Sequence, residues 1–196
     1  MAEDILNRKI ELVVVGGSAG SLEVILKILP QLTEPLHIAL VIVLHRKSSA
    51  DSTLLELLSA RTKLTVTEIE DKDPMLPGNI YLAPADYHLL FEHDHTFSLD
   101  ASEKINYSRP SLDVAFESAG DIYGPSMAGI ILSGANADGT QGLKSVRQAG
   151  GITIAQEPAT AQVPFMPQQA IQHVPVDIIL NADEMTHFIN NLKTKE

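Results

Sequence analysis

Three polar segments of the sequence each follow a short apolar run and carry residues that could act together in nucleophilic catalysis. Gly16-Gly17-Ser18-Ala19-Gly20 offers a hydroxyl, His45 offers an imidazole, and Asp138 offers a carboxylate within a glycine-rich segment. A histidine can take the proton of a serine as a general base, and an acidic side chain can orient the imidazole and stabilise its charged form. The three residue types therefore suit hydrolysis through a covalent acyl-enzyme.

The segment around Ser18 has the pattern G-x-S-x-G between an apolar run and a helical pattern. This pattern is typical of a tight turn that exposes one hydroxyl, and the N–H groups of the following helix can bind a developing oxyanion. Glycines in this place also bind dinucleotides or phosphates, but Ser18 stands where G-x-G-x-x-G needs its second glycine. The Walker pattern is absent as well, so the hydroxyl interpretation is favoured.

His45 and Asp138 each have a simpler interpretation. A single histidine after a strand can fill the rim of a sheet without chemistry, and an aspartate before a helix is a common N-terminal residue. Their shared position favours catalysis, because ligands of an open α/β sheet bind beyond the carboxyl ends of its strands. The chain order Ser…His…Asp differs from the Ser…Asp/Glu…His order of the α/β-hydrolases, which indicates a different hydrolase lineage.

The elements that would position these residues alternate between short apolar runs and amphipathic segments. This alternation predicts an α/β fold, a doubly wound, mostly parallel sheet flanked by helices, with an antiparallel hairpin insertion at about residues 79–100. We expect strands at 10–15, 38–44, 64–69, 128–132, 152–155 and 176–180, and helices at 22–29, 52–58, 112–122, 141–149, 167–172 and 183–192.

The composition restricts the possible classes of function. The chain has 196 residues, 14 Lys and Arg against 25 Asp and Glu, a formal net charge of −11, and no cysteine. The negative charge argues against nucleic-acid binding, and the missing cysteines exclude thiolate chemistry and disulfides. The longest apolar run, Ile38 to Leu44, is shorter than the about 20 residues of a membrane span, and the acidic N-terminus is no secretion signal. We expect one domain over residues 1–196 in the cytoplasm, not inserted in a membrane; the oligomeric state is not determined by the sequence.

Seven segments in a consistent order make the chain resemble a known family. They are VVVGGSAGS, VIVLH, LPGNIYLAPADYH (76–88), SRPSLD (108–113), GIILSGANADGTQG (129–142), GGITIAQEPATA (150–161) and MPQQAI (166–171). Over roughly residues 10–179 the chain resembles the catalytic domain of the chemotaxis receptor protein-glutamate methylesterase, CheB. The resemblance implies Ser18 as nucleophile, His45 as base and Asp138 as orienting acid. It also implies methyl-accepting chemotaxis receptors as the protein substrate, deamidation of receptor glutamines in some members, and no metal or organic cofactor.

The chain departs from the family pattern at several positions. Ser21 replaces the second glycine after the nucleophile, Ala135 and Asn136 stand where Met and Gly are frequent, and Ser108 stands where His is frequent. We expect backbone N–H groups near Ala19 and Ala135 to bind the oxyanion. Typical members also carry a receiver domain before the first strand, so we expect no control by phosphorylation within this chain.

Other polar or unusual residues have two interpretations each. Arg109 could hold a substrate carboxylate or carbonyl, or could anchor the loop before the helix that starts near Ser111. The run Glu92-His93-Asp94-His95 is interpreted as a solvated hairpin turn and not a metal site, and Met166-Pro167 as packing. Besides a receptor methylesterase, the sequence allows a glutamine deamidase or other carboxylesterase, and a non-catalytic module that docks to receptors.

Overall fold

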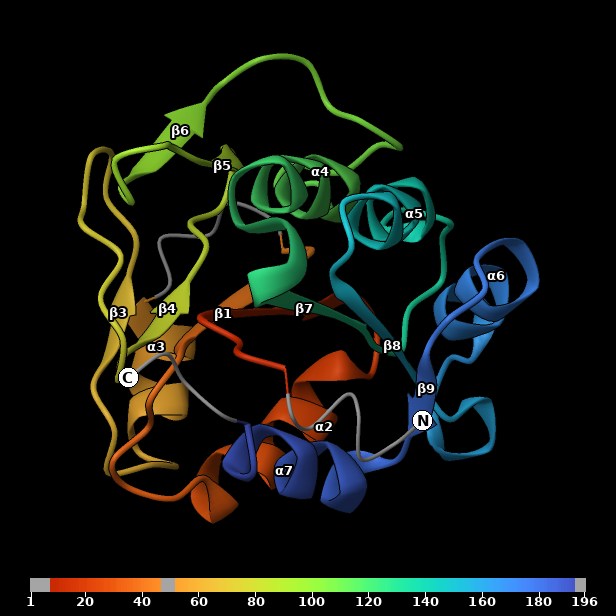
Figure 1. The fold of residues 1–196 in the computed structure, drawn as a ribbon, viewed down its shortest axis with the longest axis horizontal. Helices are drawn as coiled ribbons and strands as arrows, with labels where there is room; N and C mark the ends of the chain where they lie inside the picture. Colours follow the sequence, from red (N-terminus) through yellow and green to blue (C-terminus); the bar gives the residue numbers. More distant parts are fainter. Residues whose placement is uncertain (1–7, 47–51, 193–196) are drawn as a thin grey trace.

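Seven strands form one parallel sheet at the centre of the protein. The structure is a computed structural model that describes residues 8–46 and 52–192. The strand order is β3-β4-β2-β1-β7-β8-β9, and every neighbouring pair is parallel (Figure 1). The strands are β1 (Leu12–Gly17), β2 (Ala39–Leu44), β3 (Val66–Glu68), β4 (Ile80–Leu82), β7 (Met127–Ile131), β8 (Ile152–Gln156) and β9 (Ile178–Leu180).

Helices cover both faces of this sheet. Figure 1 shows α4 and α5 on one side and α2 and α7 on the other. The helices are α2 (Ser21–Ile28), α3 (Ser52–Ser59), α4 (Leu112–Tyr123), α5 (Thr140–Gln148), α6 (Phe165–His173) and α7 (Ala182–Asn190). The expected α/β fold with a doubly wound sheet is confirmed, and each expected strand and helix is present within a few residues of its predicted bounds.

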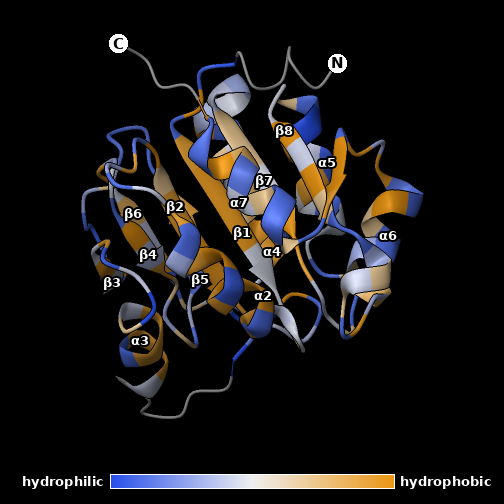
Figure 2. Cartoon of the chain, turned by 90° about the horizontal axis from the view of Figure 1, so that it is seen from below, coloured by the Kyte–Doolittle hydropathy of each residue, from blue (hydrophilic) through white to orange (hydrophobic). Residues whose placement is uncertain are grey.

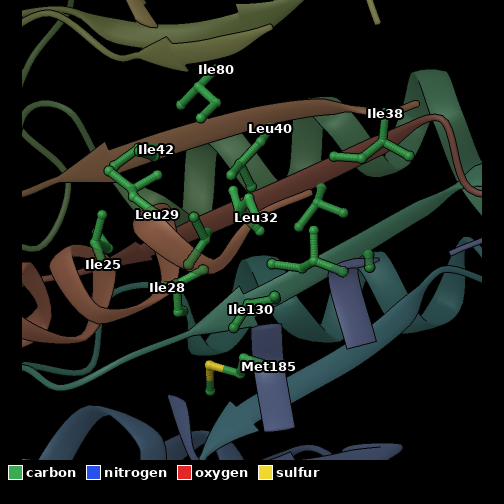
Figure 3. Close-up of a cluster of buried hydrophobic side chains, with 14 of the residues drawn as sticks. Ile25, Ile28, Leu29, Leu32, Ile38, Leu40, Ile42, Ile80, Ile130 and Met185 are labelled. Carbon is green, nitrogen blue, oxygen red and sulfur yellow. The ribbon is translucent and has the colours of Figure 1, made fainter. Parts of the chain in front are cut away.

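Alternate residues of the central strands enter two separate cores. Val13 of β1 packs in one core, with residues of α2 and α7, whereas Leu12 and Val14 pack in the other, with residues of α4 and α5. Successive strand side chains point to opposite faces, so a strand buried on both faces needs a continuous apolar run. Figure 2 shows this hydrophobic character along β1 and β2, and Figure 3 shows the first core, where Ile25 and Met185 approach the sheet.

The antiparallel hairpin is confirmed, with narrower bounds than expected. It consists of β5 (His88–Phe91) and β6 (Phe97–Asp100), and the main chain of Phe91 is bound by Ser118 of α4. Residues 80–82, which the predicted insertion of about 79–100 included, form β4 of the main sheet. Ile80 and Leu82 pack in one core and Tyr81 in the other, so this short run is buried on both faces like a central strand.

The register of the central strands brings three chain segments to one edge of the sheet. Gly17 of β1 pairs with Leu44 of β2, and Gly16 of β1 pairs with Ile131 of β7. Because these strands are parallel, the residues that follow them leave the sheet at the same carboxyl edge. Segments that are far apart in the sequence, after residues 17, 44 and 131, therefore meet there.

Candidate active site

The imidazole of His45 is bound to the carboxylate of Asp138 at the carboxyl edge of the sheet. Nε2 of His45 lies 2.6 Å from Oδ2 of Asp138, and the two side chains are 10% and 0% exposed. The main chain of His45 is fixed by its N–H, which donates to Gly17 O at 3.1 Å. Since the short contact engages Nε2, the nitrogen left to act as a base is Nδ1.

The carboxylate of Asp138 also accepts hydrogen bonds from the start of α4. Ser111 Oγ donates at 2.7 Å, and the N–H groups of Leu112 and Asp113 donate at 2.7 and 3.2 Å. Burial by itself raises the pKa of Asp138, but the hydrogen bonds from His45, Ser111 and Leu112 outweigh it and lower the pKa below its ordinary value. Asp138 is therefore an anion that fixes the imidazole, and its carboxylate accepts the first N–H groups of α4.

A second buried carboxyl group, Asp113, lies against this pair and was not singled out from the sequence. It accepts hydrogen bonds from Gly142 N at 2.7 Å and from Asn106 Nδ2 at 2.9 Å. Burial, followed by the negative charge of Asp138, raises the pKa of Asp113 to about 6 despite the hydrogen bond from Gly142. A weak signal for Asp113 is its place in the segment SRPSLD (108–113), but its burial depends on how α4 and α5 pack.

Ser18 lies on the turn after β1, beside the segment that follows β7. Its N–H donates to Ser133 O at 2.8 Å, and Ser21 Oγ donates to its carbonyl at 2.5 Å. A Cβ on Gly134 would lie 3.0 Å from Ser18 Cβ and 1.8 Å from the sulfur of Met166. The turn that carries the hydroxyl is therefore packed tightly on residues 133–134, and only glycine fits at position 134.

In this structure the base nitrogen of His45 faces a different serine. Nδ1 lies 3.3 Å from Ser108 Oγ and 3.5 Å from Asn136 Nδ2, and within the described ranges no hydrogen bond joins Ser18 Oγ to the imidazole. Ser108 and Asn136 are two of the positions where the chain departs from the family pattern. The structure thus brings His45 and Asp138 into contact and holds Ser18 on the neighbouring turn.

Two main-chain N–H groups near Ser18 are free to bind an oxyanion. Those of Ala19 and Ala135 have no acceptor among the described residues, whereas the neighbouring N–H groups of Ser18 and Gly134 donate to Ser133 O and Val163 O. Both alanines are exposed. The two N–H groups expected from the sequence are therefore unsatisfied donors on the two segments that flank the hydroxyl.

Arg109 is held by its own loop. Its Nη1 donates to the carbonyls of Ala101 and Ser102, at 2.6 Å each, which is the anchoring role that the sequence allowed. The arginine also lines a cavity of about 310 Å³, together with His45, Arg46, Asp86 and residues 104, 107 and 108. This cavity adjoins the imidazole of His45.

The remaining candidates have structural roles. Residues 92–95 form the turn between β5 and β6, where Asp94 accepts a hydrogen bond from Thr96 Oγ1 at 2.7 Å. In the described part of the chain no three His, Asp or Glu side chains are arranged to hold a metal ion. Met166 is fully buried and packs on Gly134, as expected of a packing residue.

The fold and this edge of the sheet define an α/β enzyme of the hydrolase type, with a serine turn beside a histidine–aspartate pair. Residues 13–189 match the family model described as CheB methylesterase, and the chain belongs to this family. The expected enzyme class, a protein-glutamate methylesterase, is confirmed by this membership. The roles of the individual residues stay predictions.

Individual relatives agree with this assignment. The crystal structure of the Thermotoga maritima CheB methylesterase catalytic domain has a TM-score of 0.88 and 32% identity, covering 93% of this chain and 98% of that one. A protein of Leptospira interrogans is 38% identical over 190 residues, 94% of this chain and 98% of its own length. The protein-glutamate methylesterase FrzG of Myxococcus xanthus is 35% identical over 82% of this chain, which spans only 48% of that protein. No helix in residues 8–46 and 52–192 has the length and apolarity required to cross a membrane.

Proposed function

We propose that the protein hydrolyses the methyl esters of glutamate side chains on methyl-accepting chemotaxis receptors, with Ser18, His45 and Asp138 as its catalytic triad. The observation that supports this most strongly is the buried 2.6 Å contact between His45 Nε2 and Asp138 Oδ2 at the edge of the sheet that also carries Ser18. The receptor substrate is inferred from relatives such as the Thermotoga maritima protein-glutamate methylesterase/protein-glutamine glutaminase, which is 34% identical over 175 residues.

In the proposed mechanism Ser18 Oγ attacks the ester carbonyl while His45 Nδ1 takes its proton. Asp138 keeps its hydrogen bond to Nε2–H and stabilises the imidazolium, and the N–H groups of Ala19 and Ala135 bind the oxyanion. The proton then passes from Nδ1 to the methoxide, which leaves as methanol. Water attacks the acyl-enzyme with His45 again as base, and releases the glutamate.

The first proton transfer requires one local rearrangement. Nδ1 is in contact with Ser108 Oγ at 3.3 Å and with Asn136 Nδ2 at 3.5 Å, and both can donate to an unprotonated nitrogen. The hydroxyl of Ser18 must replace these donors when substrate binds. Ser108 and Asn136 therefore hold the ring in position between turnovers.

Deamidation of receptor glutamines is a second candidate, because the Thermotoga maritima relative carries both activities in its name. The same attack on a carboxamide would release ammonia in place of methanol. Methanol and ammonia release from receptors that carry either methyl ester or glutamine would determine the balance between the two reactions.

The test of the proposal is methanol release from methylated receptor membranes, together with labelling by a fluorophosphonate. We expect wild type to be labelled on Ser18, and Ser18→Ala to lose at least about 1000-fold in kcat and all labelling. Ser108→Ala is the matched control, because it removes the hydroxyl that now contacts Nδ1. Labelling of Ser108 would move the nucleophile to that residue, and absence of both labelling and turnover in wild type would favour the non-catalytic docking module.

A further inference from the structure

Tyr107 is the most exposed large hydrophobic side chain of the described residues, at 98%, and it lies beside the candidate active site. Asn106 and Tyr107 form a two-residue turn closed by hydrogen bonds between the main chains of Ile105 and Ser108, at 2.8 and 3.2 Å. Their φ angles are 49° and 64°. Turns of this type favour Asn-Gly, and a bulky residue with positive φ is unusual, so local folding preference does not explain the tyrosine.

Both sides of this turn are fixed to the catalytic pair. Asn106 Nδ2 donates to Asp113 at 2.9 Å and lies 3.5 Å from Asp138 Oδ1. On the other side, Ser108 is buried and its hydroxyl lies 3.3 Å from His45 Nδ1. The ring of Tyr107 is therefore presented to solvent from a turn whose neighbours are anchored within the site.

The cavity next to His45 connects this ring to a group of positive charges. Tyr107 lines the cavity of about 310 Å³ together with three cations, Arg46, Lys104 and Arg109, and one carboxylate, Asp86. This grouping of cations is notable in a chain with a net charge of −11.

Two of these cations already have partners. Arg46 is paired with Glu68, and Arg109 is bound to main-chain carbonyls. Lys104 has no hydrogen bond or ion pair to any described residue, so its ammonium group is the one available to an incoming anion.

We propose that Tyr107 and Lys104 determine substrate specificity by binding the receptor segment on either side of the esterified glutamate. The ring of Tyr107 packs on the apolar side chains of that segment, and Lys104 pairs with an acidic side chain of it. The methyl ester itself is neutral, so a cation at this place recognises a neighbouring residue and not the reacting group. This inference rests on the proposed esterase function.

The test compares two substrates in the full chain: a methylated receptor in membranes and the small ester p-nitrophenyl acetate, which has no flanking segment. Tyr107→Gly removes the ring and suits the positive φ, so it should fold at least as well as wild type. We expect the ratio of receptor to small-ester kcat/KM to fall about 10-fold or more, mainly through the receptor KM. Ile179→Ala, an exposed apolar residue of β9, is the control and should keep the wild-type ratio.

Lys104→Ala tests the charge. We expect a higher receptor KM and a weaker dependence of that KM on salt than in wild type, because exposed charge pairs are screened by ions. Lys144→Ala, an exposed lysine of α5, should keep the wild-type salt dependence. If wild type is active and both Tyr107→Gly and Lys104→Ala keep its ratio of receptor to small-ester kcat/KM, this inference is wrong and the proposed function still stands. A wild type inactive on both esters would overturn the proposed function, and this inference with it.

Discussion

His45 is bound to Asp138 through Nε2, at 2.6 Å, and this contact decides which ring nitrogen can act as a base. Asp138 is fully buried and accepts the N–H groups of Leu112 and Asp113, so it cannot turn away from the imidazole without leaving these donors unpaired. The hydrogen bonds keep the carboxyl group ionised, and an ionised carboxylate only accepts. Nε2 must therefore carry the proton, which leaves Nδ1 free to receive one.

Asp138→Asn should reduce catalysis strongly while the fold is retained. The asparagine oxygen can keep the hydrogen bonds that Ser111 Oγ and Asp113 N donate to Oδ1, whereas the NH₂ group replaces Oδ2 and loses the one from Leu112 N. The NH₂ group then faces Nε2 and favours the tautomer with the proton on Nδ1. In known triads the equivalent change lowers kcat about 10⁴-fold. The measurement is kcat on a small ester, with circular dichroism to check folding. Asp121→Asn, on the exposed side of α4, is the control, and an Asp138→Asn enzyme with near wild-type kcat would remove Asp138 from the mechanism.

Gly134→Ala should lower both stability and activity. Its Cβ would lie 1.8 Å from Met166 Sδ and 3.0 Å from Ser18 Cβ, so the methionine and the serine turn must move. Overpacking of this kind destabilises by about 1–3 kcal/mol. We expect a lower Tm and a lower kcat, with part of the lost stability recovered in the double variant Gly134→Ala/Met166→Ala.

The control for this prediction is Gly120→Ala. Its Cβ would meet Val146 at 3.5 Å, an ordinary contact, and alanine favours the helix. We expect no loss of Tm for this variant. An equal loss in the two glycine variants would show that the close approach to Met166 and Ser18 is not the cause.

The periodicity of the sequence was sufficient to predict the sheet and the edge where the site lies. A strand such as β2, Ala39–Leu44, is buried on both faces, so its run of apolar residues ends where the chain leaves the sheet, and His45 follows at once. The same reasoning could not separate β4 from the hairpin, because three apolar residues have no period long enough to show which sheet they join.

The residues around the triad could not be predicted in the same way. Asp113 is buried beside Asp138 because α4 and α5 pack together, and its sequence context is that of an ordinary helix N-terminus. Ser108 was noted only as a departure from the family pattern, and its contact with His45 Nδ1 depends on the path of the loop 101–110. Such contacts between distant segments have no local signal in the sequence.

Asp113 should make the unfolding free energy fall as pH rises from about 4 to 6. Its pKa is about 6 in the folded protein and near 3.8 when unfolded, so between these values the folded state binds more protons at this group. Stability then decreases as pH rises, by about 3 kcal/mol in total at 1.36 kcal/mol per pH unit. The pKa of Asp138 is lowered, so this carboxyl group changes the unfolding free energy only at pH values below this range.

The measurement for Asp113 is urea unfolding of wild type and Asp113→Asn between pH 4 and pH 7. We expect the unfolding free energy of wild type to fall relative to that of Asp113→Asn as pH rises. The variant also loses the acceptor for Asn106, which lowers its unfolding free energy by the same amount at every pH. Asp121→Asn should show no such change with pH. A pH-independent difference between wild type and Asp113→Asn would mean that the pKa of Asp113 is not raised.

Ser133→Ala should weaken the oxyanion site without touching the nucleophile. Ser133 Oγ donates to Ala19 O at 2.7 Å and accepts from Val163 N at 2.8 Å, and it thereby joins the serine turn to the segment before α6. Alanine removes both hydrogen bonds from these partly exposed main-chain groups, at about 1 kcal/mol of stability each. Because the free N–H of Ala19 is then held less firmly, we expect kcat to fall on receptor and small esters alike, with KM little changed. Ser145→Ala, at a partly exposed position of α5, is the control. A Ser133→Ala enzyme with lowered Tm but wild-type kcat would show that this hydroxyl only stabilises the fold.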